Sequence, residues 1–254
     1  MKIELRRKEV RFLYGLVIAA DLLFLFANTP WMSLPIVEGQ PAKLTSLFDF
    51  VKYQLDLKIE QNVATWYSSV LLLAAAAAAA LNFRRSAASR FKWIERAGWG
   101  GLCVLLIALS ADETATIHET LARLFNAMNE GTGRSQYRVG AGDWIPILLP
   151  FIGAVSVGMA AFFVYLFHKR TRVLFLSGAG VIFWIAAIYA ESIEAGMVHL
   201  NMSRVAEGFL EESCEILGTT ALLFAFTEFF RLSETLSDSP HPHNAQVKQK
   251  PRRR

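Results

Sequence analysis

Long apolar stretches constrain the fold of this chain more than any other feature. Of its 254 residues, 54% are hydrophobic. A helix rises 1.5 Å per residue, so it needs about 20 apolar residues to cross roughly 30 Å of hydrocarbon. The apolar runs are continuous instead of alternating, which favours helices over a barrel. The sequence therefore predicts an all-α fold, a polytopic membrane bundle of about six transmembrane helices: 12–28, 63–83, 98–122, 144–168, 173–195 and 206–230.

The positions of Lys and Arg predict how this bundle is oriented. Of the 26 basic residues, 19 fall in the N-terminal segment, the second and fourth loops and the C-terminal tail, which share one side of a six-span protein. The alternate loops hold the other 7. We therefore expect a multi-pass protein of the cell inner (plasma) membrane with both termini cytoplasmic. The net charge of +4 follows from this asymmetry and requires no nucleic-acid partner.

Composition divides the chain into two parts. Residues 1–232 hold all the apolar runs and are expected to form the six-helix transmembrane domain, whereas residues 233–254 are polar and are expected to be a disordered cytoplasmic tail. Within the membrane part, seven consecutive alanines, Ala74 to Ala80, predict a smooth surface on which a neighbouring helix packs closely. The aromatic residues of 48–62 predict a short helix at headgroup level.

Carboxylates lie in or beside these apolar runs at three places: DETATIHE at 112–119, YAESIEA at 189–195 and EGFLEESCE at 207–215. A carboxylate near hydrocarbon costs several kcal/mol unless it is paired, protonated or bound to a cation. Counted along the expected helices, about 15 apolar residues separate Asp112 and Glu215 from the cytoplasmic side, which is about 22 Å of rise. The three motifs, with Glu60, are therefore expected to meet at the outer side of the membrane.

Helical geometry supports one shared site. On a continuous helix, Asp112 and Glu119 would lie about 20° apart, and Glu207, Glu211 and Glu215 would form a stripe. Carboxylates gathered in this way must share protons or bind cations. Oxygen donors with one histidine suit iron or manganese, with zinc, magnesium or calcium as alternatives. The expected metal ligands are Asp112, His118, Glu119, Glu211 and Glu215, and the expected proton-transfer groups are Glu113, Glu191 and Glu212.

Structural interpretations of the same residues stay open. Acids at the outer ends of helices are often simply solvated, and those early in a helix favour its N-terminal dipole. This applies most to Glu60, Glu194 and Glu207 taken singly. Asp21 lies deeper than the other acids, where a polar tie between helices is an equally good interpretation.

Three motifs resemble those of uncharacterised bacterial multi-pass membrane proteins. The first is Glu60 with the helix start Thr-Trp-Tyr-Ser at 65–68, the second is Asp-Glu-x4-His-Glu at 112–119, and the third is Glu-Glu-x2-Glu at 211–215. The resemblance covers most of the membrane part. It implies a shared site and names no reaction.

The expected function is therefore a metal-dependent enzyme that acts on a lipid or lipid-linked substrate at the outer leaflet. A cation or proton transporter is the first alternative, although transport sites usually lie nearer the midplane. The second is an ion- or pH-sensing membrane protein without turnover. The sequence does not decide whether the chain is an enzyme, and it leaves the oligomeric state open.

Overall fold

The structure is a computed structural model that describes residues 7–29, 46–59, 61–88, 92–118, 120–121, 124, 127, 145–194, 198, 200 and 203–237. These residues form seven α-helices and a short 3₁₀ turn (η1) and contain no strand, which confirms the predicted all-α fold. The elements are α1 (Arg7–Ala27), α2 (Leu47–Leu55), α3 (Val63–Arg85), η1 (Ser86–Ala88), α4 (Lys92–Ala115), α6 (Ile145–Phe167), α7 (Thr171–Glu194) and α8 (Arg204–Ser237).

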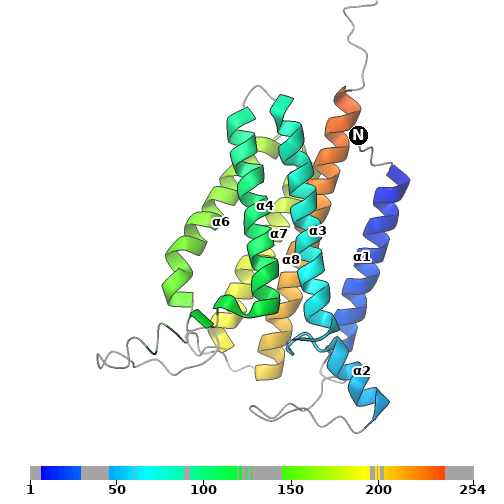
Figure 1. Cartoon of the computed structure of the whole chain (residues 1–254), viewed down its shortest axis with the longest axis vertical. Coiled ribbons are helices and arrows are strands. Elements are labelled where there is room, and N and C mark those ends of the chain that lie inside the picture. Colours follow the sequence, from blue (N-terminus) through cyan, green and yellow to red (C-terminus); the bar gives the residue numbers. More distant parts are fainter. Residues whose placement is uncertain are drawn as a thin grey trace, which may run out of the picture.

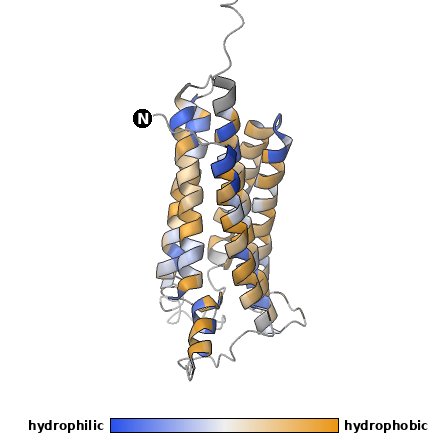
Figure 2. Ribbon diagram, turned by 90° about the vertical axis from the view of Figure 1, so that its right-hand side faces the viewer, coloured by the Kyte–Doolittle hydropathy of each residue, from blue (hydrophilic) through white to orange (hydrophobic). Residues whose placement is uncertain are grey.

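Six of the described helices, all except α2, are long and apolar enough to cross a membrane. They lie roughly side by side (Figure 1). Their hydrophobic residues occupy the middle of the bundle, and their hydrophilic residues gather towards its two ends (Figure 2). The chain is therefore a multi-pass membrane protein, as predicted. Its helices start and end within about ten residues of the predicted spans, and α8 continues to Ser237.

Helix α8 is the central element of the bundle. In the 18-residue apolar stretch of α8, 78% is buried inside the protein, against 11% in the corresponding stretch of α6. The indole of Trp99 on α4 is fully buried and forms an edge contact with the ring of Phe226 on α8, their centroids 5.0 Å apart. The rings of Phe162 and Phe167 on α6 surround the same indole. This aromatic cluster joins α4 and α6 to α8.

Small residues let other helices approach α8 closely. The predicted packing role of the alanine run is confirmed, because Ala75 and Ala79 of α3 are fully buried in the core. On α7, a Cβ at Gly180 would lie 3.0 Å from the carbonyl oxygen of Gly218 on α8. A Cβ at Gly218 would lie 3.1 Å from the carbonyl oxygen of Gly180. Each glycine therefore makes room for the backbone of the other helix.

Helix α1 is joined to the bundle by a buried carboxyl group. The Tyr67 hydroxyl of α3 donates to Asp21 Oδ1 at 2.5 Å, and the Thr220 hydroxyl of α8 donates to Asp21 Oδ2 at 2.9 Å. Asp21 is 3% exposed. The structural interpretation of Asp21, a polar tie between helices, is thus confirmed.

The two ends of the bundle differ in charge. The start of α1, the α3–α4 connection, the α6–α7 turn and the end of α8 meet at what we call the basic end (Figure 1). The ends of α4 and α7 and the start of α8 meet at the acidic end. The predicted short helix of the 48–62 segment exists as α2 at the acidic end. Its last turn is held there by Asn28, whose side chain donates to Leu55 O and accepts from Leu57 N.

Candidate functional site at the acidic end

A sharp turn ends α4 within the DETATIHE motif. Thr116 has a φ of 47°, in the left-handed region that a β-branched residue rarely adopts. Its N–H donates to Asp112 O at 2.7 Å, and helical structure resumes at Ile117. The prediction of one continuous helix through residue 122 is therefore wrong. Glu119 lies outside the described residues, so its predicted angle to Asp112 stays a prediction. The sequence did not predict this turn, because no Gly or Pro lies between residues 112 and 119.

The turn brings His118 back onto the side chain of Asp112. Asp112 Oδ1 accepts from the backbone N–H of His118 at 2.8 Å, and Oδ2 lies 2.7 Å from the ring nitrogen Nδ1. The two side chains are partly exposed, 31% for His118 and 24% for Asp112. Both carboxylate oxygens thus hold the histidine, one through its backbone and one through its ring.

This pairing fixes the chemistry open to the imidazole. An ionised carboxylate only accepts hydrogen bonds, so with Asp112 ionised Nδ1 carries the proton of the contact. The other ring nitrogen, Nε2, is then the atom that can exchange a proton with a substrate or with solvent. A histidine oriented by a carboxylate in this way is the usual arrangement both for general acid–base catalysis and for metal ligation. Asp112 is thus placed to hold His118, and the metal-ligand role predicted for Asp112 stays a prediction.

Hydrogen bonds join the end of α4 to α3 just before the Asp112–His118 pair. The hydroxyl oxygens of Ser69 and Ser110 lie 2.7 Å apart, and Ser110 Oγ is 3.0 Å from Ser69 O. Both serines are buried. Hydroxyl contacts between membrane helices of this kind hold the helices in register. Asp112, two residues further on, therefore starts from a fixed position.

Carboxylates of α7 and α8 interact electrostatically with this pair or with each other. The charge of Glu215 interacts with those of Asp112, Glu113, His118 and Glu191. The charge of Glu212 interacts with those of Glu113, Glu191, Glu211 and Glu215. Glu191 is buried, and the three α8 glutamates are partly buried. Seven of the eight residues predicted for the site are therefore brought into one electrostatic neighbourhood by α4, the Thr116 turn, α7 and α8.

The negative charges gathered in this neighbourhood need compensation. Carboxylates that repel each other in a partly buried site hold protons between them or attract a cation. Among the residues that the structure describes, no group of three or more His, Cys, Asp or Glu side chains is placed to hold one metal ion. The metal ligands named from the sequence remain a prediction, and Glu119, one of the five, lies outside the described residues.

The helix-start motif Thr-Trp-Tyr-Ser has a structural role here. Asn62 caps α3 by accepting the N–H of Thr65 at 2.9 Å, and Tyr67 holds Asp21. Trp66 is 63% exposed. Glu60 lies outside the described residues, as does the side chain of Glu194. The partners Ser69–Ser110 and Asp21–Thr220 were not predicted, because hydropathy shows polar residues in a span but not which helix faces them.

The chain belongs to a family whose function is not known. A family model described as "Domain of unknown function (DUF8692)" matches residues 11–229, which include almost all of the six membrane helices. No curated protein and no solved structure matches the chain.

Proposed function

We propose that this protein is a membrane enzyme that performs acid–base chemistry on a lipid or lipid-linked substrate at the acidic end of the bundle. One observation carries the proposal: the Asp112 carboxylate orients the His118 imidazole at 2.7 Å, at the point where the charges of α8 converge. Acid–base groups positioned in this way contribute on the order of 10²–10⁴ to a rate. A substrate entering from the bilayer would meet the site at the level where the helices end.

Each residue has a stated role in this proposal. His118 moves the proton at the reacting atom, and Asp112 orients it. Glu113, Glu191 and Glu212 pass protons to and from the site, with Glu211 and Glu215 supplying further acidic groups. The charge interactions among these side chains support a shared pool of protons.

Metal binding belongs to the proposal only as a prediction. Iron or manganese is favoured by the donor set, with zinc, magnesium or calcium as alternatives. The described side chains do not form such a site as they stand. The chemistry proposed above includes no step routed through a metal ion. Metal content measured by mass spectrometry, in wild type beside the Asp112→Ala/Glu215→Ala variant, tests this prediction separately.

Orientation completes the proposal. The concentration of Lys and Arg at the basic end supports a position in the cell inner membrane with both termini cytoplasmic. The acidic end would then face outward, and the substrate would be a lipid of the outer leaflet.

Proton transport is the second candidate, and the Asp21 junction favours it. A buried carboxyl group deep in a membrane helix often marks a proton path. Asp21 lies deeper in the bundle than the acidic end, because its partner Thr220 is five residues, about 7.5 Å of helix rise, beyond Glu215 on α8. Proton entry into vesicles that Asp21→Asn abolishes, with no change in any lipid, would place transport ahead of catalysis. A sensor without turnover would show neither effect.

The test of the enzyme proposal compares the lipids of membranes that contain different variants. Cells producing wild type should differ from cells without the protein in at least one lipid species, and cells producing His118→Gln should not. His168→Gln is the matched control, because His168 is an exposed histidine at the basic end. The proposal fails if His118→Gln changes the lipids as wild type does.

A further inference from the structure

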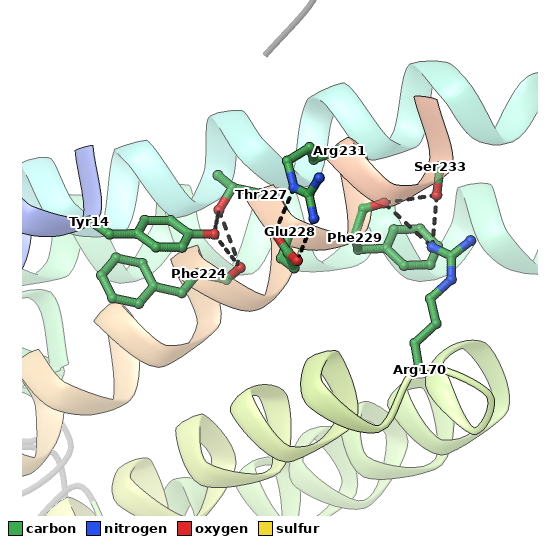
Figure 3. A network of polar contacts seen from close by, with 8 residues as sticks. All are labelled: Tyr14, Arg170, Phe224, Thr227, Glu228, Phe229, Arg231 and Ser233. Carbon is green, nitrogen blue, oxygen red and sulfur yellow. Dashed lines mark hydrogen bonds and ion pairs between the residues drawn. The ribbon is translucent and has the colours of Figure 1, made fainter. Parts of the chain in front are cut away.

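Two buried carboxyl groups, one on α1 and one on α8, are compensated in different ways. Glu228 of α8 is 7% exposed and is held by Arg231 through contacts of 2.7 and 2.9 Å (Figure 3). Asp21 of α1 is 3% exposed, and its contacts within the described residues are with the hydroxyl groups of Tyr67 and Thr220. An arginine neutralises a carboxylate, whereas a hydroxyl group leaves the negative charge in place. Asp21 therefore either keeps a full charge or holds a proton.

The charged residues of the surrounding helices lie at other levels than Asp21. On α1 the nearest is Arg11, about 15 Å away along the helix, and α3 has none before its last two residues. On α8 the nearest are Glu215 and Glu228, about 7.5 and 12 Å along the helix from Thr220. A lone carboxylate inside a membrane bundle costs several kcal/mol. This cost favours the state in which Asp21 holds a proton.

Tyr67 is the titratable group that faces Asp21, and its hydroxyl group has two acceptors on α1. Its oxygen lies 2.5 Å from Asp21 Oδ1 and 3.4 Å from Val17 O. With Asp21 ionised, Tyr67 and Thr220 each donate to one carboxylate oxygen, and 2.5 Å is typical of a hydroxyl group bonded to a charged oxygen. With Asp21 protonated, its own O–H donates to the Tyr67 oxygen, and Tyr67 donates to Val17 O instead. Hydrogen bonds are therefore available in both states.

We propose that Asp21 is a reversible proton-binding site and that Tyr67 is the group that switches between its two states. When the proton leaves Asp21 for water, the Tyr67 hydroxyl rotates from Val17 O to Asp21 Oδ1. Tyr67, from the helix-start motif at 65–68, thereby gains a role beyond packing. The inference is independent of the chemistry at the acidic end, because it concerns the equilibrium binding of a proton and requires neither turnover nor transport.

The test follows the infrared carbonyl band of protonated carboxylic acids in the purified protein as the pH is varied. The spectrum of wild type minus that of Asp21→Asn isolates the band of Asp21, which should be present at low pH and disappear as the pH rises. In the Tyr67→Phe background this loss should move to higher pH by about one to two pH units, because the ionised carboxylate loses one of its two hydrogen bonds. Thr220→Val should move it in the same direction.

Figure 3 shows the residues that provide two matched controls. The Tyr14 hydroxyl lies 3.0 Å from Phe224 O and 2.8 Å from Thr227 Oγ1, away from Asp21, so Tyr14→Phe should titrate as wild type. Glu228 is paired with Arg231, so wild type minus Glu228→Gln should contain no band of a protonated acid at neutral pH.

Three outcomes would overturn the proposal. The first is equal spectra of wild type and Asp21→Asn at every pH, which would show a permanently ionised group. The second is an Asp21 band that persists at every pH at which the protein stays folded. The third is an unchanged midpoint in Tyr67→Phe, or an equal shift in Tyr14→Phe. If Asp21→Asn does not fold, protein labelled with carbon-13 at its aspartate carboxyl groups decides, and a labelled band that Tyr67→Phe leaves unchanged contradicts the site.

Discussion

At the scale of the residue, the proposed chemistry depends on Asp112 holding His118. Replacing Asp112 with Asn should lower turnover by on the order of 10²–10⁴, because an amide neither fixes the ring tautomer nor stabilises the imidazolium. The fold should persist, since Asn can still accept from the backbone N–H of His118. Turnover is measured on the lipid species that wild type alters. Asp49→Asn on α2 is the matched control, and equal losses in both variants would contradict the role of Asp112.

The turn at Thr116 allows a test of the backbone strain that shapes the site. A β-branched residue at a φ of 47° is strained, so Thr116→Gly should keep or raise the stability, by up to about 1 kcal/mol. Thr114→Gly is the control, because Thr114 is helical and exposed two residues earlier and should lose about 0.5–1 kcal/mol. Thermal unfolding in detergent measures both. A greater loss at 116 than at 114 would show that the turn is not strained.

At the scale of the element, the contact between α7 and α8 sets the distance between Glu191 and the α8 glutamates. Gly180→Ala should destabilise the protein by about 1–3 kcal/mol, because its Cβ would lie 2.7 Å from Leu222 Cγ and 3.0 Å from Gly218 O. Gly178→Ala, on the same helix with open space around the added Cβ, should be neutral or slightly stabilising. Thermal unfolding of the two variants provides the measurement. Equal stability of both would mean that the helices approach each other less closely.

At the scale of the whole molecule, much of the fold follows from the sequence. Six apolar runs are enough to predict six spans. Inside hydrocarbon no water is present to bond the backbone N–H and C=O groups, so each span must be a helix that bonds them internally. The alignment of three acidic motifs at one end follows from the rise of a helix, and the structure brings Asp112, Glu191 and Glu215 together as expected. The level of a residue along a membrane helix can therefore be predicted from the sequence.

The sequence does not predict in the same way which helices and side chains are neighbours. The turn at Thr116 depends on Asp112 accepting the backbone N–H of His118, a contact that no hydropathy pattern contains. The pairing of Asp21 with Thr220 depends on which helices are neighbours, and these residues are 199 positions apart in the chain. The end of the bundle at which the described acidic residues lie was thus predictable, whereas the Asp112–His118 geometry required the structure.

The central claim is that His118 and the α8 glutamates form one site that changes a membrane lipid. The most direct test measures the conversion of that lipid in wild type, His118→Gln, Glu215→Gln and the double variant. Residues that act as a unit are strongly non-additive. We predict that each single variant loses about 100-fold or more and that the double variant is no slower than the slower single. Single variants as active as wild type, or losses that multiply in the double variant, would contradict the claim.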